Sequence, residues 1–388
     1  MPSPWDSAEP YPPKRNPRLG DIVHTATGHL LTERQLLENL VRFPLVYVGE
    51  VHDNPASHRL QLLIIKAMYA SNPGKVVLGM EMFNYEQQQA LDQWVNGELN
   101  EREFLRESRW FSNWAADYEL YQELLEFCRQ QQIPVIGLNV PKALGRQVSM
   151  TPLDQLDSET RAKLPEMDMS DPYQRAMIEK IFEVHGAGSK MVDSFFRRQT
   201  LWDESMAQGV ADYMRQNPGH QMMVVAGGWH VRYGFGIPRR VHRRLPIPYA
   251  LVGEYHLQIP AEKENQLMDV TMPSFPMRAV DYLVYQEYEV FEAKGVKLGV
   301  LLDDSDASDD GVGIGITGVS PGSAAERAGI EKGDRILSFD GNTLADSFDL
   351  TYATRVKRVG DSATIELLRG ELKLTLEVIF TPQPDKHP

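Results

Sequence analysis

Polar side chains lie at the ends of several apolar runs of this sequence, each close behind a glycine. The ones that could do chemistry are Glu50 and His52 after the first run, Glu81 in the second and His230 after the fourth. The runs are PLVYVGE (44–50), VVLGMEMF (76–83), IPVIGLN (133–139) and QMMVVAGG (221–228). A glycine at such a place lets the backbone turn sharply and approach a ligand closely.

Imidazole and carboxylate groups in this pattern could serve three purposes. Glu50, His52, Glu81 and His230 could ligate a divalent metal such as zinc or iron. They could act as catalytic residues without a metal, with a histidine and a glutamate as an acid/base pair. They could also line a cavity for an organic cofactor. A structural role, such as capping a helix or satisfying a buried backbone group, suits any one of them alone. Their coincidence at run ends favours a functional site.

The position of these side chains depends on the fold. From Leu45 onward, short apolar runs alternate with segments of helical composition such as 58–70 and 117–130. This alternation predicts an α/β domain with a predominantly parallel sheet flanked by helices. The carboxyl ends of parallel strands share one edge, where ligands bind, so we expect the four side chains to face one crevice. A long helical insertion is expected over 171–216, and the irregular stretch 255–295 is interpreted as the interdomain connection.

An arginine-rich segment follows His230 in a chain whose net charge is −14. Guanidinium groups pair with carboxylates and phosphates, so the segment suits an anionic ligand; pairing with the protein's own acidic surface is the alternative. The segment contains Arg232, Arg239, Arg240, Arg243 and Arg244. A group of aromatic residues precedes the third run, and such residues are usually core, although a flat cofactor would need a similar wall. They are Trp110, Trp114, Tyr118 and Tyr121.

The bulk composition limits the classes of function. The acidic balance argues against nucleic-acid binding, and no apolar run is long enough to span a bilayer. The single cysteine, Cys128, excludes an intramolecular disulfide framework and a cysteine-rich zinc site. Residues 1–19 are proline-rich without an apolar signal core, so we expect a disordered leader there. Export and localisation stay open on these grounds.

The C-terminal part of the chain follows a different pattern of short strands and turns. Its elements are KLGVLLDD, then GVGIGITGVSPGSAAERAGIEKGDRILSFDGNTL, a helix from Ser347, and the hairpin TIELLRGELKLTLEVIF. This part resembles a PDZ domain over 295–381, with a tail at 382–388. The resemblance implies that Leu298, Gly299 and Val300 bind the C-terminus of a peptide or protein beside an open strand edge. Lys297 stands where many members carry glycine. The acidic stretch DDSDASDD (303–310) lacks the last glutamate of a calcium loop and is expected to be a solvated hairpin tip.

The large domain, 20–290, resembles the ChaN-like family of haem-binding proteins, which belongs to a group with Tiki-type metalloproteases and erythromycin esterases. The resemblance rests on VYVGEVHDNPASHRLQLLIIKAM, VVLGMEMFNYEQQQALDQWVNGEL, IPVIGLNVPKALGRQV, FFRRQTLWDESMAQ and VVAGGWHVRYGFGIPRR. It implies haem or iron handling at the bacterial cell envelope. For haem, an axial ligand would be a tyrosine or histidine. We favour Tyr233 over His52, His58 and His230, with Arg232, Arg239 and Arg240 for the propionates.

Three functions follow from the sequence. The first is a haem- or iron-binding protein with a peptide-binding PDZ module, acting in haem or iron uptake or handling. The second is a metal-dependent peptidase or esterase that uses the histidine and glutamate cluster. The third is a non-catalytic interaction protein. A homodimer is compatible with each of them, and whether the chain is an enzyme is left open.

Overall fold

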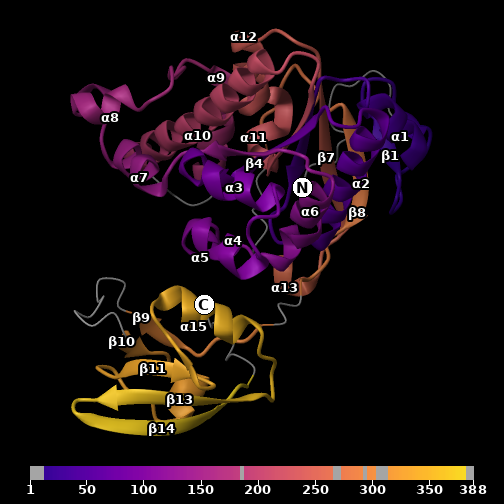
Figure 1. Ribbon diagram of the computed structural model, residues 1–388. Coiled ribbons are helices and arrows are strands. Elements are labelled where there is room, and N and C mark those ends of the chain that lie inside the picture. Colours follow the sequence, from indigo (N-terminus) through magenta and orange to yellow (C-terminus); the bar gives the residue numbers. More distant parts are fainter. Residues whose placement is uncertain (1–12, 184–187, 265–271, 292–294, 303–312, 382–388) are drawn as a thin grey trace. The chain divides into compact units, whose positions relative to one another are not determined.

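The computed structural model describes residues 13–183, 188–264, 272–291, 295–302 and 313–381. The acidic stretch 303–310, the tail 382–388 and most of the expected leader lie outside these ranges. The chain divides into two compact units, Met1–Phe291 and Glu292–Pro388 (Figure 1). No helix within the described ranges combines the length and apolar character needed to cross a bilayer.

The large unit is built on a sheet of eight described strands in the order β2-β1-β8-β7-β3-β6-β4-β5. Strands from β8 through β5 run parallel, and β1 pairs antiparallel with both β8 and β2. The prediction of a predominantly parallel sheet flanked by helices is therefore confirmed. The strands are β1 (Ile22–His24), β2 (His29–Leu31), β3 (Leu45–Glu50), β4 (Val76–Asn84), β5 (Val135–Asn139), β6 (Gln221–Gly227), β7 (Tyr249–Gln258) and β8 (Tyr282–Glu287).

The interpretation of 255–295 as an interdomain connection is wrong for most of its length. β7 extends to Gln258, and β8 lies inside the sheet between β7 and β1. The segment YLVYQE of β8 is short and only partly buried. Its apolar pattern is therefore weaker than that of the central strands, each of whose residues is buried.

Helices cover both faces of the sheet, because the central strands are apolar on both sides. One face packs on α10 and α12 through a cluster that includes Tyr47, Val224 and Met206. The intervening residues Val46 and Val48 are also buried, on the face that α2 contacts. The helices are α1 (Glu33–Leu40), α2 (Pro55–Ser71), α3 (Gln88–Val95), α4 (Glu101–Glu107), α5 (Trp110–Asn113), α6 (Glu119–Gln130), α7 (Lys142–Met150), α8 (Ser158–Ala162), α9 (Pro172–Glu183), α10 (Ser189–Gln216), α11 (Gly228–Val231), α12 (Ile237–Arg244) and α13 (Ala261–Glu264), with short 3-10 turns at Tyr85–Gln87, Leu153–Gln155 and Arg232–Gly234.

The C-terminal unit is a small antiparallel sheet with its own core. Strand order is β14-β13-β11-β10-β9, with β12 paired to β11, so β9 lies at one end of the order. Ile336, Ile365 and Leu367 are fully buried between the sheet and the helices. The elements are β9 (Val300–Leu302), β10 (Ile314–Val319), α14 (Ala324–Arg327), β11 (Arg335–Phe339), β12 (Asn342–Thr343), α15 (Ser347–Arg355), β13 (Ser362–Arg369) and β14 (Leu372–Ile379).

Candidate functional site

Glu50, the last residue of β3, is a buried carboxylate with several partners. Its Oε1 accepts hydrogen bonds from the Tyr121 hydroxyl at 2.6 Å and from His52 Nδ1 at 2.7 Å. Its Oε2 accepts one from Gln61 Nε2 at 2.5 Å. Burial alone would raise the pKa of Glu50, but the hydrogen bond from His52 and the charge of His58 bring it below its usual value. The side chain is therefore an anion that holds His52 in place.

His52 is the exposed member of this group, with 42% of its side-chain surface accessible. Its ring stands edge-on to Trp114, with centroids 4.9 Å apart. Burial lowers its pKa, but the bond to Glu50 and the charge of Glu81 outweigh this and raise it above the ordinary value. Nδ1 is bonded to Glu50, whereas Nε2 has no hydrogen-bond partner among the described residues; a Cβ placed on Gly227 would lie 3.1 Å from that nitrogen.

His230, in α11 directly after β6, lies between two carboxylates. Its Nδ1 donates to Asp203 Oδ1 of α10 at 2.6 Å, and its Nε2 lies 3.3 Å from Glu81 Oε1 of β4. Burial lowers the pKa of His230, but Glu81 and Asp203 together raise it to about 10. Burial likewise raises the pKa of Glu81, whereas His230 and the other nearby groups lower it to about 2. At neutral pH the three groups therefore form a buried carboxylate–imidazolium–carboxylate row.

The structure brings Glu50, His52, Glu81 and His230 to the carboxyl edge of the sheet. They form two pairs, Glu50 with His52 and Glu81 with His230. The charge of Glu81 also raises the pKa of His52, which links the two pairs electrostatically. Within the described ranges, no group of three or more histidine, cysteine, aspartate or glutamate side chains is placed to hold a metal ion. Both nitrogens of His230 are already engaged with carboxylates. The metal interpretation of these four residues has no support in this geometry.

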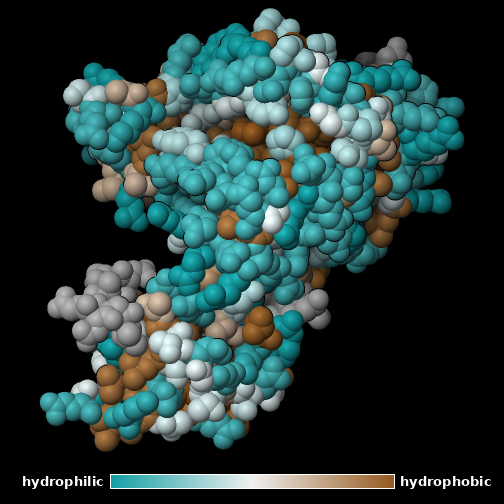
Figure 2. All heavy atoms as spheres, viewed as in Figure 1, coloured by the Kyte–Doolittle hydropathy of each residue, from teal (hydrophilic) through white to brown (hydrophobic). Residues whose placement is uncertain are grey.

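An aromatic shelf lies next to this edge, formed by Tyr173, Tyr233, Phe235 and Phe275. Tyr233 and Tyr173 each stack on Phe235, with centroids 5.2 and 5.7 Å apart, and the Phe275 ring lies 4.9 Å from that of Tyr233. Phe235 is buried, whereas Tyr173 is 41% exposed. In the view of Figure 2, apolar side chains appear in a recess of the large unit near α10 and α11, bordered by hydrophilic ones.

Comparison with known proteins supports one family. Residues 36–241 match the model of the haem-binding uptake family of the Tiki superfamily, ChaN, and residues 296–380 match the PDZ domain. The chain belongs to the ChaN family. A solved structure, "Cofacial heme binding to ChaN of Campylobacter jejuni", is similar with a TM-score of 0.52 at 15% identity, covering 70% of this chain and 98% of that one.

Two further similarities are weaker or shorter. An erythromycin esterase, EreC, aligns with a TM-score of 0.43 at 12% identity, covering 67% of this chain and 95% of that one. The putative serine protease HhoA of Synechocystis sp. is 38% identical over 66 residues. That match spans 17% of this chain and 17% of HhoA. The C-terminal unit of this ChaN-family chain is thus a PDZ domain.

Haem is the ligand that ChaN membership implies, and the donors near the shelf differ in how well they fit it. Tyr233 is half-buried, and its hydroxyl has no hydrogen-bond partner among the described residues. His58 is 6% exposed, and its Nε2 donates to the His52 carbonyl oxygen at 3.1 Å. His230 is equally buried, with both nitrogens bonded. A flat aromatic surface that carries a free phenol fits haem, whereas these two imidazoles do not.

The arginine-rich segment pairs mainly with the protein's own acids. Arg239 binds Asp168 and Asp171, at 3.2 and 3.1 Å. Arg240 is fully buried, 3.1 Å from Glu204, and its guanidinium also donates to the carbonyl oxygen of Phe235. Arg243 and Arg244 bind the same glutamate. Of the two interpretations of this segment, internal pairing describes Arg239 and Arg240.

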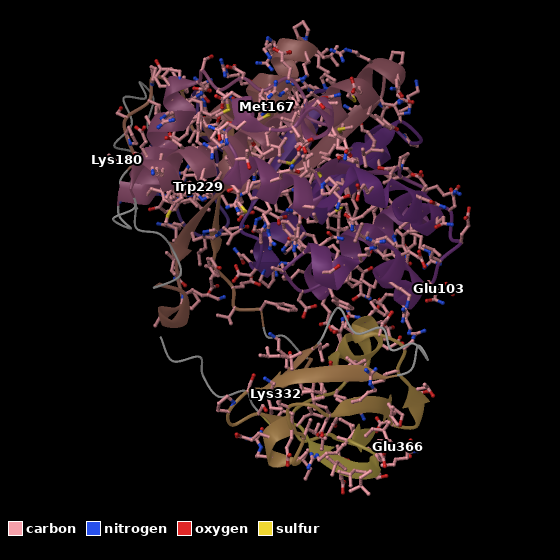
Figure 3. The ribbon with its side chains drawn as sticks, turned by 90° about the vertical axis from the view of Figure 1, so that its left-hand side faces the viewer. Glu103, Met167, Lys180, Trp229, Lys332 and Glu366 are labelled. Carbon is pink, nitrogen blue, oxygen red and sulfur yellow. The ribbon has the colours of Figure 1, made fainter. Side chains whose placement is uncertain are left out.

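Arg232 differs from the other arginines of the segment. Among the described residues it forms no ion pair, and its guanidinium lies over two aromatic rings of the same segment. These are Trp229, labelled in Figure 3, at 5.8 Å and Tyr233 at 5.9 Å. A half-buried guanidinium on the shelf is available to an anionic group of a ligand.

The aromatic group before β5 belongs mainly to the core. Trp110, Tyr118 and Tyr121 are 1% exposed or less, and only Trp114 is half-buried, against His52. Tyr121 nevertheless takes part in the site through its hydroxyl on Glu50.

Sequence reasoning missed two parts of the site. The first is Asp203, which is fully buried in α10. No motif in the surrounding sequence identifies it as a site residue. Glu254 and His256, near the end of β7, form a second carboxylate–imidazole pair, 3.3 Å apart, and Ser57 donates a hydrogen bond to Glu254 at 2.7 Å. A signal for this pair was present, because Gly253-Glu254-Tyr255-His256 repeats the spacing of Gly49-Glu50-Val51-His52.

Proposed function

We propose that this chain binds haem on the aromatic shelf, with Tyr233 as axial ligand and Arg232 beside a propionate, as part of haem or iron handling. The proposal rests mainly on the strained backbone conformation of Tyr233. Its φ is +58°, a left-handed conformation that a bulky aromatic residue adopts only at a cost of about 1 kcal/mol or more. The surrounding structure must therefore hold it there.

The restraint on Tyr233 comes from both sides of the segment. Its N–H donates to the Ala279 carbonyl oxygen at 2.8 Å. After it, the buried Arg240 guanidinium bonds the carbonyl oxygens of Phe235 and Gly236. Strain that is maintained in this way is typical of functional residues. Family membership adds support, since the family is one of haem-binding uptake proteins.

Haemin titration with absorption spectroscopy tests this function. We expect a saturable change of the Soret band with the wild-type chain. Tyr233→Phe should weaken binding and alter the spectrum, because a phenylalanine offers no donor to iron. Arg232→Ala should weaken binding and leave the spectrum of the remaining complex unchanged. Tyr85→Phe and Arg239→Ala are matched controls, since Tyr85 lies outside the shelf and Arg239 is paired with aspartates. Absence of any saturable change in the wild-type protein would end the haem proposal.

For the PDZ unit we propose binding of an extended peptide with an apolar C-terminus. Gly299 has φ +86°, its carbonyl oxygen accepts from Ser320 N–H at 2.8 Å, and β9 follows at the end of the sheet order. Among the described strands β9 pairs with β10 alone, which supports a peptide strand beside Leu298, Gly299 and Val300. Affinity for a single module should be about 1 μM or weaker. Fluorescence polarisation with free and amidated peptides of the same sequence is the test; equal binding of both would contradict C-terminal recognition.

A second candidate function is hydrolysis without a metal. The observation in its favour is the Glu50–His52 pair, a buried carboxylate that orients a half-exposed imidazole. Such a pair can act as a general base that removes a proton from water. The base works when deprotonated, so hydrolysis of an aryl ester should fall as pH drops through the raised pKa of His52. His52→Gln should abolish it, while His242→Gln, an exposed histidine of α12, should not. An inactive wild-type chain would exclude this candidate.

A further inference from the structure

The metal donors of the aromatic shelf are all of one chemical kind. Of its four rings, only Tyr173 and Tyr233 carry an atom that can bind a metal, and in both it is a phenol oxygen. A phenol becomes a strong ligand only after it loses its proton, and it is then a hard, anionic oxygen donor. The shelf therefore offers a porphyrin-bound metal a negative charge and no nitrogen.

The nearest imidazole in the sequence is not an alternative donor. His230 precedes Tyr233 by three residues, but its Nδ1 is bonded to Asp203 at 2.6 Å and its Nε2 lies 3.3 Å from Glu81. Taking either nitrogen for a metal would leave a buried carboxylate without its charged partner, which costs about 3–5 kcal/mol. His52 has a free Nε2 and is therefore included in the test below.

The backbone that carries Tyr233 is held by several contacts. The position after Phe235 requires a glycine, because a Cβ on Gly236 would overlap the His230 carbonyl oxygen. The Arg240 bond to the Gly236 carbonyl oxygen and the Tyr233 N–H bond to Ala279 hold the same stretch of backbone. We therefore expect the affinity for a metalloporphyrin to depend on the charge of its metal more than on a rearrangement of the segment around Tyr233.

We infer that the shelf selects porphyrins with a trivalent metal over those with a divalent metal or none. This inference rests on the proposed haem site. When the phenolate oxygen bonds to the metal, the water or hydroxide carried by the free metalloporphyrin leaves, and the phenol proton passes to that hydroxide or to solvent. A trivalent metal in the dianionic ring carries one positive charge, which the phenolate neutralises. With Arg232 paired to a propionate, a divalent metal would leave the unit of metal, ring and phenolate with one negative charge at a half-buried site, where charge is poorly solvated.

The test compares Fe(III), Ga(III), Zn(II) and metal-free protoporphyrin IX on the full chain. Ga(III) has the charge of Fe(III) without its redox chemistry. Binding is followed by quenching of tryptophan fluorescence, which reports the large unit alone because no tryptophan lies beyond Trp229. We expect Fe(III) and Ga(III) to bind at least about tenfold more tightly than the other two. Tyr233→Phe should remove this difference, while His52→Gln and Tyr85→Phe should preserve it.

Each other outcome has a definite meaning. If no porphyrin binds, the proposed function itself fails. If all four bind equally to the wild-type chain, ring packing holds the porphyrin, so haem binding stands and the selectivity is refuted. If Zn(II) binds most tightly and His52→Gln removes that preference, a nitrogen donor is the ligand and the inference is also refuted. The wild-type comparison decides the question even where a variant folds poorly.

Discussion

Replacing Asp203 by asparagine removes one of the two charges that flank His230 and changes almost nothing in size. Nδ1 of His230 and Oδ1 of Asp203 are 2.6 Å apart, and at an effective dielectric constant of about 20 their attraction is about 6 kcal/mol. The variant no longer bears the cost of burying the carboxylate, and Glu81 still contacts the ring. We therefore expect a net loss of about 3 kcal/mol in the free energy of unfolding.

Urea unfolding followed by tryptophan fluorescence measures this loss in the large unit. With an m-value of about 3 kcal/mol per molar, the midpoint should fall by about 1 M. Asp212→Asn is the matched control, because Asp212 lies in the same helix but is half-exposed and paired with Arg215 at 3.0 Å. The control should shift the midpoint by less than about 0.3 M, as expected for a surface ion pair.

The pH dependence of the same experiment tests the charge on His230. Its pKa is raised to about 10 in the folded chain, so its stabilising contribution is complete below the unfolded value of about 6.5. That contribution is lost at about 1.4 kcal/mol per pH unit as pH rises to about 10. Asp203→Asn should end this loss at a lower pH. A wild-type stability that does not change between pH 7 and 10, or a variant as stable as the wild type, would refute the buried imidazolium.

Three further changes have outcomes that the structure determines. Gly236→Ala should destabilise the large unit by about 3 kcal/mol in urea unfolding through overlap with the His230 carbonyl, while Gly228→Ala, whose Cβ would meet nothing closer than 3.7 Å, should cost far less. Cys128 is fully buried and its thiol pKa is raised by burial, so a disulfide reagent should modify it only in denaturant. Gly299→Ala should abolish peptide binding in fluorescence polarisation, because a Cβ there would overlap the side chain of Ser323.

The fold could be predicted wherever apolar runs were strong. The central strands are buried on both faces, so they stand out as continuous apolar segments that contain a glycine, and the sheet edge could be located from them. The outer strands could not be found in the same way. β1 and β2 have three residues each, and β8 is partly exposed, so none of them forms a continuous buried run.

The site was predictable only for residues at the ends of strands. Glu50, His52, Glu81 and His230 could be placed together because parallel strands share an edge. Asp203 could not, since a charged residue in a helix usually faces solvent, and its partner is 27 positions away. The sequence could not show that Arg240 pairs with Glu204 instead of a ligand. The two residues become neighbours only when α10 packs against α12.

The packing of α10 against residues 230–244 has a consequence for the way this protein can be altered or recombined. Asp203 and Glu204 are consecutive residues of α10, yet each serves a different part of the later segment: one bonds His230, the other Arg240 and Arg244. A graft of the later segment into another scaffold would arrive with buried cations and no counter-charges. The two stretches therefore form one exchangeable module, and in any chimaera we expect them to be inherited together.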